Sequence, residues 1–163
     1  MDAAIRAGAD FAPVILAGDG EPASSGVPRG GTRILGIGVD AVDVVRFRRV
    51  MARRPRLTTR CFTEGERSYA GISGDPGLRL ATRFAAKEAV MKCLGVGITA
   101  VAFREIEVVR PGRDQPVLSL SGRARAQAEV MGITGWHLSL THTDTLAMAF
   151  VVAEGAADRS PSA

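Results

Sequence analysis

The pattern of hydrophobic and polar positions divides the chain into strands and helices. Alternation predicts half-buried strands at 103–109 and 136–141, and apolar runs predict strands at 33–40, 117–120 and 146–152. Helical spacing and capping signals predict helices at 43–54, from Thr63, from Pro76 to Leu94, and at 121–131. Helices and strands come partly in blocks. We therefore expect an α+β fold, with a small, mainly antiparallel sheet packed against a long helix.

Capping residues mark the predicted helix ends. Asp43 is a plausible N-cap, and Pro55 ends that helix. Thr63 and Glu66 have the spacing of a capping box, and Asp75 followed by Pro76 opens the long helix. Gly95 is expected to stop the long helix.

The chain of 163 residues suits one domain. Residues 1–32 are rich in Ala, Gly, Pro and Ser and are predicted to be a flexible N-terminal extension. The folded domain is expected at 33–154, followed by a flexible tail at 155–163. The chain has no apolar run long enough to cross a membrane and no secretion signal, so we expect a cytoplasmic protein.

Positive charge is concentrated in one part of the sequence. The formal net charge is +4, yet the window 41–60 holds seven arginines and one aspartate. These arginines are Arg46, Arg48, Arg49, Arg53, Arg54, Arg56 and Arg60. Such a patch predicts docking of an acidic partner, which leaves nucleic acid, an anionic membrane, a phosphorylated ligand and an acidic protein open.

The two cysteines and two histidines do not have the spacing of a structural zinc site. Cys61 and Cys93 are interpreted as core thiols in a reducing compartment. His137 is interpreted as structural. His142, at the end of the strand predicted at 136–141, is either a hydrogen-bonded core histidine or a donor to a phosphate.

The long helix carries charges within its apolar face. Leu80, Phe84 and Met91 share one arc, Lys87 lies inside that arc, and Glu88 lies at its edge. Burying a charge without a partner is costly, so either a partner compensates Lys87 or the side chain extends to solvent.

A second carboxylate follows the first predicted strand. Asp40 comes after Gly36-Ile37-Gly38-Val39, where the glycines would let another backbone or a phosphate approach closely. Asp40 is either an ordinary strand-end residue or, together with Glu88, a ligand of Mg²⁺, which typically takes one or two protein carboxylates.

These segments, in this order, resemble the holo-acyl-carrier-protein synthase family of phosphopantetheinyl transferases. The matching motifs are Gly36-Ile37-Gly38-Val39-Asp40, Cys61-Phe62-Thr63-Glu64-Gly65-Glu66, Arg83-Phe84-Ala85-Ala86-Lys87-Glu88-Ala89 with the helix up to Gly95, Gln115-Pro116, and Ser139-Leu140-Thr141-His142. The resemblance covers Arg33 to about Glu154. It implies a 4'-phosphopantetheinyl transferase-like fold.

The resemblance also implies a reaction and its residues. The phosphopantetheine arm of coenzyme A would pass to a serine of apo acyl carrier protein. Asp40 and Glu88 would be the Mg²⁺ ligands, with Glu88, Lys87 and His142 catalytic. Lys87, Arg83 and His142 would contact coenzyme A. Arg46, Arg53 and Arg56 would dock the acidic carrier, and a homotrimer is implied.

Two departures and several alternatives accompany this interpretation. In the family the fold normally begins with the first strand, whereas here residues 1–32 precede that strand. Cys93 stands where the family commonly has a small aliphatic residue. The main alternative is a non-catalytic basic module that binds nucleic acid or an acidic protein. A nucleotide hydrolase is disfavoured, because the sequence has no Walker-type phosphate-binding loop. A carrier-binding domain that has lost its catalytic activity is disfavoured, because Asp40 and Glu88 are retained. The class of carrier, whether for fatty acid, polyketide or peptide synthesis, stays open.

Overall fold

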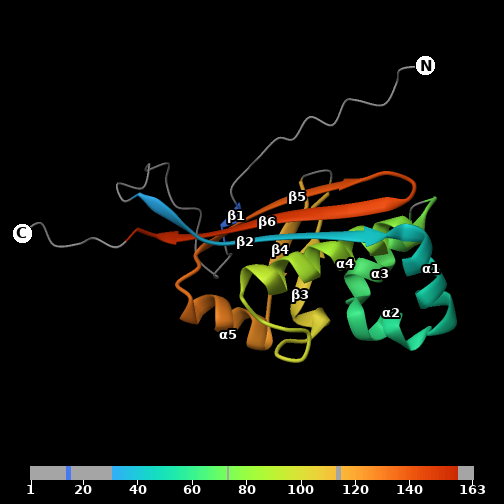
Figure 1. Ribbon diagram of the computed structural model, residues 1–163, viewed down its shortest axis with the longest axis horizontal. Coiled ribbons are helices and arrows are strands. Elements are labelled where there is room, and N and C mark those ends of the chain that lie inside the picture. The colour runs from blue at the N-terminus through green and yellow to red at the C-terminus, as the bar shows by residue number, and fades with distance from the viewer. Residues whose placement is uncertain (1–13, 16–30, 73, 113–114, 158–163) are drawn as a thin grey trace, which may run out of the picture.

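The computed structural model describes residues 14–15, 31–72, 74–112 and 115–157 (Figure 1). The elements, in chain order, are β1 (Val14–Ile15), β2 (Thr32–Asp43), α1 (Val44–Arg53), α2 (Arg56–Cys61), α3 (Glu64–Gly71), α4 (Pro76–Cys93), the 3-10 helix η1 (Phe103–Glu105), β3 (Ile106–Val109), β4 (Val117–Leu120), α5 (Gly122–Val130), β5 (Gly135–His142) and β6 (Leu146–Ala156). The expected α+β fold is confirmed.

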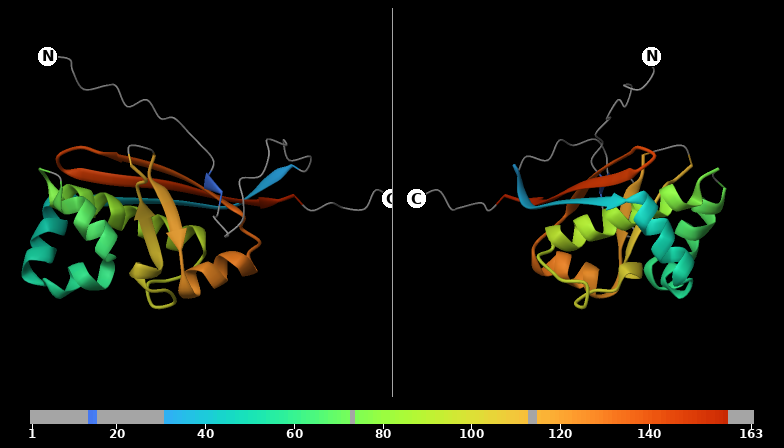
Figure 2. Two further views of the ribbon diagram at one scale, coloured as in Figure 1. Left: turned by 180° about the vertical axis from the view of Figure 1, so that it is seen from behind. Right: turned by 45° about the vertical axis from the view of Figure 1, so that its right-hand side comes forward.

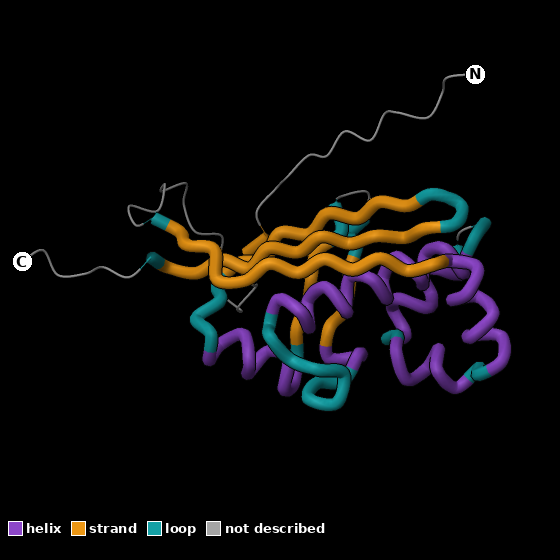
Figure 3. Tube along the Cα trace, in the orientation of Figure 1, coloured by secondary structure: helices purple, strands orange, loops and turns teal. Residues whose placement is uncertain are grey.

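A long antiparallel sheet forms one layer of the molecule. Its strand order is β1-β5-β6-β2, and β3 and β4 form a separate two-stranded sheet. The ladder between β2 and β6 runs from Thr32 opposite Ala156 to Asp43 opposite Leu146. The helices of the described residues lie on one side of the long sheet (Figure 3). Among the described residues, none of the helices covers the opposite side of this sheet.

Helix α4 lies directly on the sheet, against β2 and β6 (Figure 2). Small side chains permit this contact, because Ala85, Ala86 and Ala89 are fully buried. A Cβ atom on Gly38 would lie 1.8 Å from the carbonyl oxygen of Ala89. The predicted close approach at this glycine is thus an approach of helix backbone to strand backbone.

The predicted caps are confirmed. The Asp43 carboxylate accepts the Arg46 amide at 2.7 Å, and Thr63 and Glu66 form both bonds of a capping box. Asp75 accepts the amide of Leu78 at 3.0 Å, and helix α4 ends before Gly95, whose φ is +66°. Local polar chemistry therefore sets where these helices begin and end.

Two predicted strands differ from the structure, and one helix was missed. The strand predicted at 33–40 continues to Asp43, so Asp40 lies inside β2 and not at its end. The strand predicted at 103–109 begins as η1 and becomes strand only at Ile106. Helix α2 was not predicted, because its six residues carry no side-chain cap and too short a pattern to show a period.

The predicted bounds of the domain stay a prediction, and two strands lie at least partly beyond them. Val14 and Ile15, within the extension expected to be flexible, form β1 and pair with Trp136 and Gly135 of β5. Strand β6 continues to Ala156, beyond the expected end of the domain. The other residues of 1–30 and of 158–163 lie outside the described residues, so those predictions stay untested.

The described residues contain no helix that is both long and apolar enough to span a membrane. Cys61 and Cys93 are both buried free thiols, as the sequence predicted. Burial raises the pKa of both thiols above its usual value, which makes them less reactive at neutral pH.

Candidate active site

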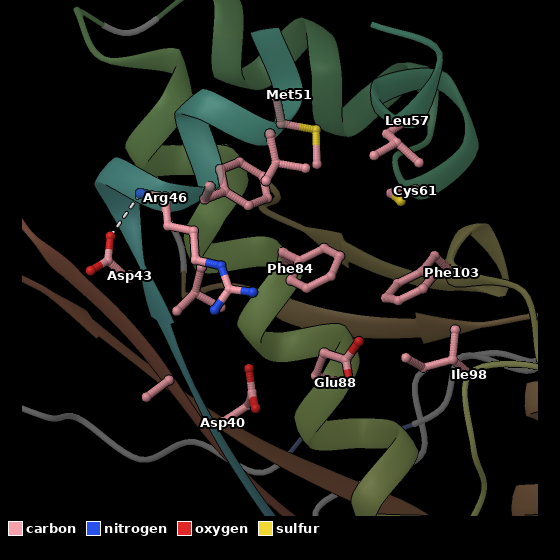
Figure 4. A pocket seen from close by; sticks show the side chains of 14 residues that line it. Asp40, Asp43, Arg46, Met51, Leu57, Cys61, Phe84, Glu88, Ile98 and Phe103 are labelled. Atoms are coloured by element: carbon pink, nitrogen blue, oxygen red, sulfur yellow. Dashed lines mark hydrogen bonds between the residues drawn. The ribbon is translucent and has the colours of Figure 1, made fainter. Parts of the chain in front are cut away.

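A pocket of about 620 Å³ opens between the end of β2 and helices α1, α2 and α4 (Figure 4). Charged side chains gather at one end, and apolar side chains line the rest. The charged lining residues are Asp40, Asp43, Arg46 and Glu88, and the apolar ones include Phe47, Val50, Met51, Leu57, Phe84, Ile98 and Phe103. The pocket thus joins an end with more negative than positive side chains, which suits a cation, to an apolar surface.

The structure brings Asp40 and Glu88 together, although 47 positions (88 − 40 − 1) separate them in the chain. Asp40 comes from β2 and Glu88 from α4, and the close packing at Gly38 brings the two elements into contact. Burial and the negative charge of Asp40 raise the pKa of Glu88, and Lys92 offsets part of this effect. Two carboxylates that repel each other in this way fit a cation between them.

Lys92 is a site residue that the sequence analysis missed. Its ammonium lies 2.8 Å from the Asp40 carboxylate and also donates to the carbonyl of Val39. The side chain is 53% exposed, so it can also meet a ligand from solvent. The sequence did contain a signal for Lys92, because a spacing of four residues places it one helical turn after Glu88.

Lys87 does not line the pocket, and its predicted contact with coenzyme A phosphates stays a prediction. Its ammonium is fully buried, 2.8 Å from Glu66, and donates to the carbonyls of Phe103 and Ile106. An ammonium has three donors, and these three partners use them all. The compensating partner expected from the sequence is therefore Glu66.

Arg83 and His142 also lie away from the pocket of their own chain. Arg83 is buried, with its guanidinium stacked over the ring of Tyr69 at 4.2 Å. His142 is exposed at the end of β5, with β6 between it and β2. At the usual strand spacing this puts β5 about 10 Å from β2. Neither side chain meets Asp40 or Glu88 within the chain.

The predicted docking arginines lie on the outer surface around the pocket. Arg46 lines the pocket itself, and Arg53 and Arg56 are exposed on α1 and α2. Arg48 of the same cluster is paired with Asp75. The basic patch is thus continuous with the acidic end of the pocket.

Two aromatic rings form an apolar wall that the sequence analysis did not assign to a site. Phe84 and Phe103 stack with their centroids 5.0 Å apart, and Phe47 packs on Phe84. Helical spacing placed Phe84 in the core. Nothing in the local pattern of Phe103 indicated a pocket, because its position depends on contacts distant in sequence.

Comparisons with known proteins agree on one family. The model of the 4'-phosphopantetheinyl transferase superfamily matches residues 36–150. The holo-[acyl-carrier-protein] synthase of Micrococcus luteus is 46% identical over 132 residues, covering 80% of this chain and 99% of the relative. That of Beutenbergia cavernae is 45% identical, covering 74% and 98%.

Solved structures with a similar fold belong to the same family. The holo-[acyl-carrier-protein] synthase of Neisseria meningitidis has a TM-score of 0.68 at 34% identity, covering 74% of this chain and 98% of the other. That of Bacillus anthracis, in complex with CoA (3',5'-ADP), has a TM-score of 0.62 at 34% identity, covering 75% and 97%. With its paired carboxylates on β2 and α4, this chain belongs to the holo-[acyl-carrier-protein] synthase family of the 4'-phosphopantetheinyl transferase superfamily.

Proposed function

We propose that this chain transfers the 4'-phosphopantetheine group of coenzyme A to a serine of an apo acyl carrier protein, in a magnesium-dependent reaction. The observation that carries the proposal is the pair Asp40 and Glu88 at the charged end of the pocket, in a chain of this family. The products are holo carrier protein and adenosine 3',5'-bisphosphate.

Asp40 and Glu88 would hold the magnesium ion. Among the described residues no three His, Cys, Asp or Glu side chains are placed to hold one metal ion together, so the other ligands would be water and phosphate oxygens. When bound, the ion supplies positive charge to the phosphate oxygens. Burial and, after it, the charge of Asp40 raise the pKa of Glu88, so a cation bound beside the two carboxylates would offset a cost that the folded protein already carries.

Lys92 and Arg46 would contribute the positive charge of the chain itself. The serine hydroxyl attacks the phosphorus on the pantetheine side, and the leaving group is a bisphosphate, so negative charge must be neutralised. Lys92 lies beside Asp40 with half of its side chain exposed, where it can turn to a phosphate oxygen. Arg46 lines the same pocket.

The arginines on α1 and α2 would receive the acidic carrier protein. Arg46 lines the pocket while Arg53 and Arg56 face solvent nearby, so a carrier docked on them would present its serine at the charged end. Charges of this kind mainly steer association and set orientation.

A homotrimer would complete the site. Ile37, Val39 and Phe150 lie on the uncovered face of the long sheet and are 57%, 48% and 41% exposed. An apolar patch of this kind is usual for an interface, and we assign it to further copies of the chain. His142, which is exposed and lies away from its own pocket, would then serve the site of a neighbouring subunit, whereas buried Arg83 would stay with Tyr69 inside its own chain.

The free cysteines support a cytoplasmic location, because two unpaired thiols suit a reducing compartment.

A mass spectrum tests the proposed function. Apo acyl carrier protein is incubated with the enzyme, coenzyme A and magnesium, and the expected result is a gain of one phosphopantetheine that a chelator prevents. A gain that persists in chelator would contradict the magnesium assignment. Strong DNA binding at matched salt, without any gain in carrier mass, would instead favour the basic-module alternative.

A further inference from the structure

A buried ion pair lies next to the site without lining the pocket. The Lys87 ammonium is 2.8 Å from a carboxylate oxygen of Glu66, and neither side chain is exposed to solvent. The same carboxylate accepts the backbone amides of Thr63 and Val108, each at 3.0 Å. Lys87 in turn donates to backbone carbonyls, so both charged groups are fully bonded.

This network joins three segments that are distant in sequence. Glu66 belongs to the first turn of α3, Lys87 to the middle of α4, and the backbone partners to η1 and β3. The carbonyl of Phe103, 2.9 Å from the Lys87 ammonium, belongs to the residue whose ring stacks on Phe84 in the pocket wall. The pair therefore fixes that wall relative to α4.

The pair also determines the placement of Glu88. Lys87 precedes Glu88 in the chain, so hydrogen bonds that hold Lys87 in one direction also fix the adjacent helical turn. A buried ion pair is weak evidence for stability, because an uncharged pair of similar size often supports a fold equally well. Its hydrogen bonds are directional, however, and they specify one arrangement of helix and wall.

We infer that Lys87 and Glu66 are positioning residues for the transfer reaction. Through their hydrogen bonds they fix the positions of Glu88 and of the wall formed by Phe84 and Phe103. Neither Lys87 nor Glu66 touches the substrate. This inference rests on the proposed function, and it separates Lys87 from the phosphate contact that the resemblance implied.

Four variants test this role: Glu66→Gln, Lys87→Met, the double variant, and Glu64→Gln as control. Glu64 is an exposed carboxylate in the same turn of α3 and lies outside the site. Steady-state kinetics are measured on the folded fraction, which is established by circular dichroism. Amide exchange at Val108 reports on the network directly, because that amide donates to Glu66.

Each single variant is expected to lower kcat by about 100-fold, the effect of a displacement of roughly 1 Å. The KM for carrier protein should change by less than about twofold, because the docking arginines lie on other helices. The double variant lacks the same hydrogen bonds as Lys87→Met, so its kcat should fall no further than that of Lys87→Met, as expected for two residues that act as one unit. Amide exchange at Val108 should accelerate in Glu66→Gln and stay as in wild type in Glu64→Gln.

Two results would overturn the inference. If the losses of the two single variants multiplied in the folded double variant, Lys87 and Glu66 would act independently and not as a positioning pair. If folded Glu66→Gln kept the wild-type kcat, the pair would not position the site. An inactive wild-type enzyme would instead contradict the proposed function, and faster exchange at Val108 in Glu66→Gln would still show that the network orders the wall.

Discussion

At the scale of single residues, the charge of the pocket depends on Lys92. Its ammonium pairs with Asp40 at 2.8 Å, but the side chain is half exposed, and such a pair contributes at most about 1 kcal/mol to stability. We expect Lys92→Met to keep the fold and to lower kcat by about 100-fold, as loss of one charge-stabilising donor does. Thermal unfolding and the carrier-mass assay measure the two effects, and an unchanged kcat would remove Lys92 from the site.

Glu88 should make the stability of the metal-free protein depend on pH. Its pKa is raised by burial and by the charge of Asp40, so the folded state holds the proton more tightly than the unfolded chain. Stability therefore falls as the pH rises through the interval between the ordinary and the raised pKa. Glu88→Gln should raise the Tm at pH 7 in chelator, and this gain should vanish below about pH 4, near the ordinary pKa of glutamate.

Circular dichroism melts of wild type and Glu88→Gln at the two pH values check this expectation. The same variant should transfer no phosphopantetheine, because the amide cannot replace a carboxylate at a cation. A Tm difference that did not change with pH would show that folding does not raise the pKa of the Glu88 carboxyl group.

At the scale of elements, the contact of α4 with β2 assembles the two carboxylates. A Cβ on Gly38 would collide with the backbone of Ala89, which cannot move as a flexible side chain can. We expect Gly38→Ala to lower the free energy of unfolding by about 3 kcal/mol through overpacking. The helix would be pushed away from the strand, so kcat in the folded fraction should fall by about 100-fold.

Gly71→Ala is the matched control for that substitution. Gly71 ends α3, and a Cβ there would meet nothing within 4 Å. This control should be neutral or stabilise the protein by up to about 1 kcal/mol. Urea unfolding compares the two variants, and equal stabilities would show that the contact at Gly38 is not tight in solution.

The elements also show which features the sequence could predict. Asp43, Thr63 and Asp75 act on amides three residues away, so a local pattern was sufficient to place their helices. Strand β1 depends on the free edge of β5, which no local pattern reveals.

The residues of the site also fall into those that the sequence could predict and those that it could not. Asp40 and Glu88 were paired through the resemblance to the family, because two carboxylates this far apart in the chain give no local signal that they meet. The partner of Lys87 could not be identified, because Glu66 belongs to a different helix and its capping box already explained it.

At the scale of the whole molecule, the uncovered face of the sheet determines whether the chain works alone. Val39 is 48% exposed there, beside Ile37 and Phe150. If this face joins copies of the chain, Val39→Glu buries an unpaired carboxylate in the interface and should yield monomers. Transfer should fall in parallel, because the exposed His142 would no longer reach a neighbouring pocket. The matched control is Ile72→Glu, which places the same charge on an isoleucine that is 87% exposed after α3. Light scattering after size exclusion gives the mass of each species, and a wild-type monomer with full transfer activity would show that one chain suffices.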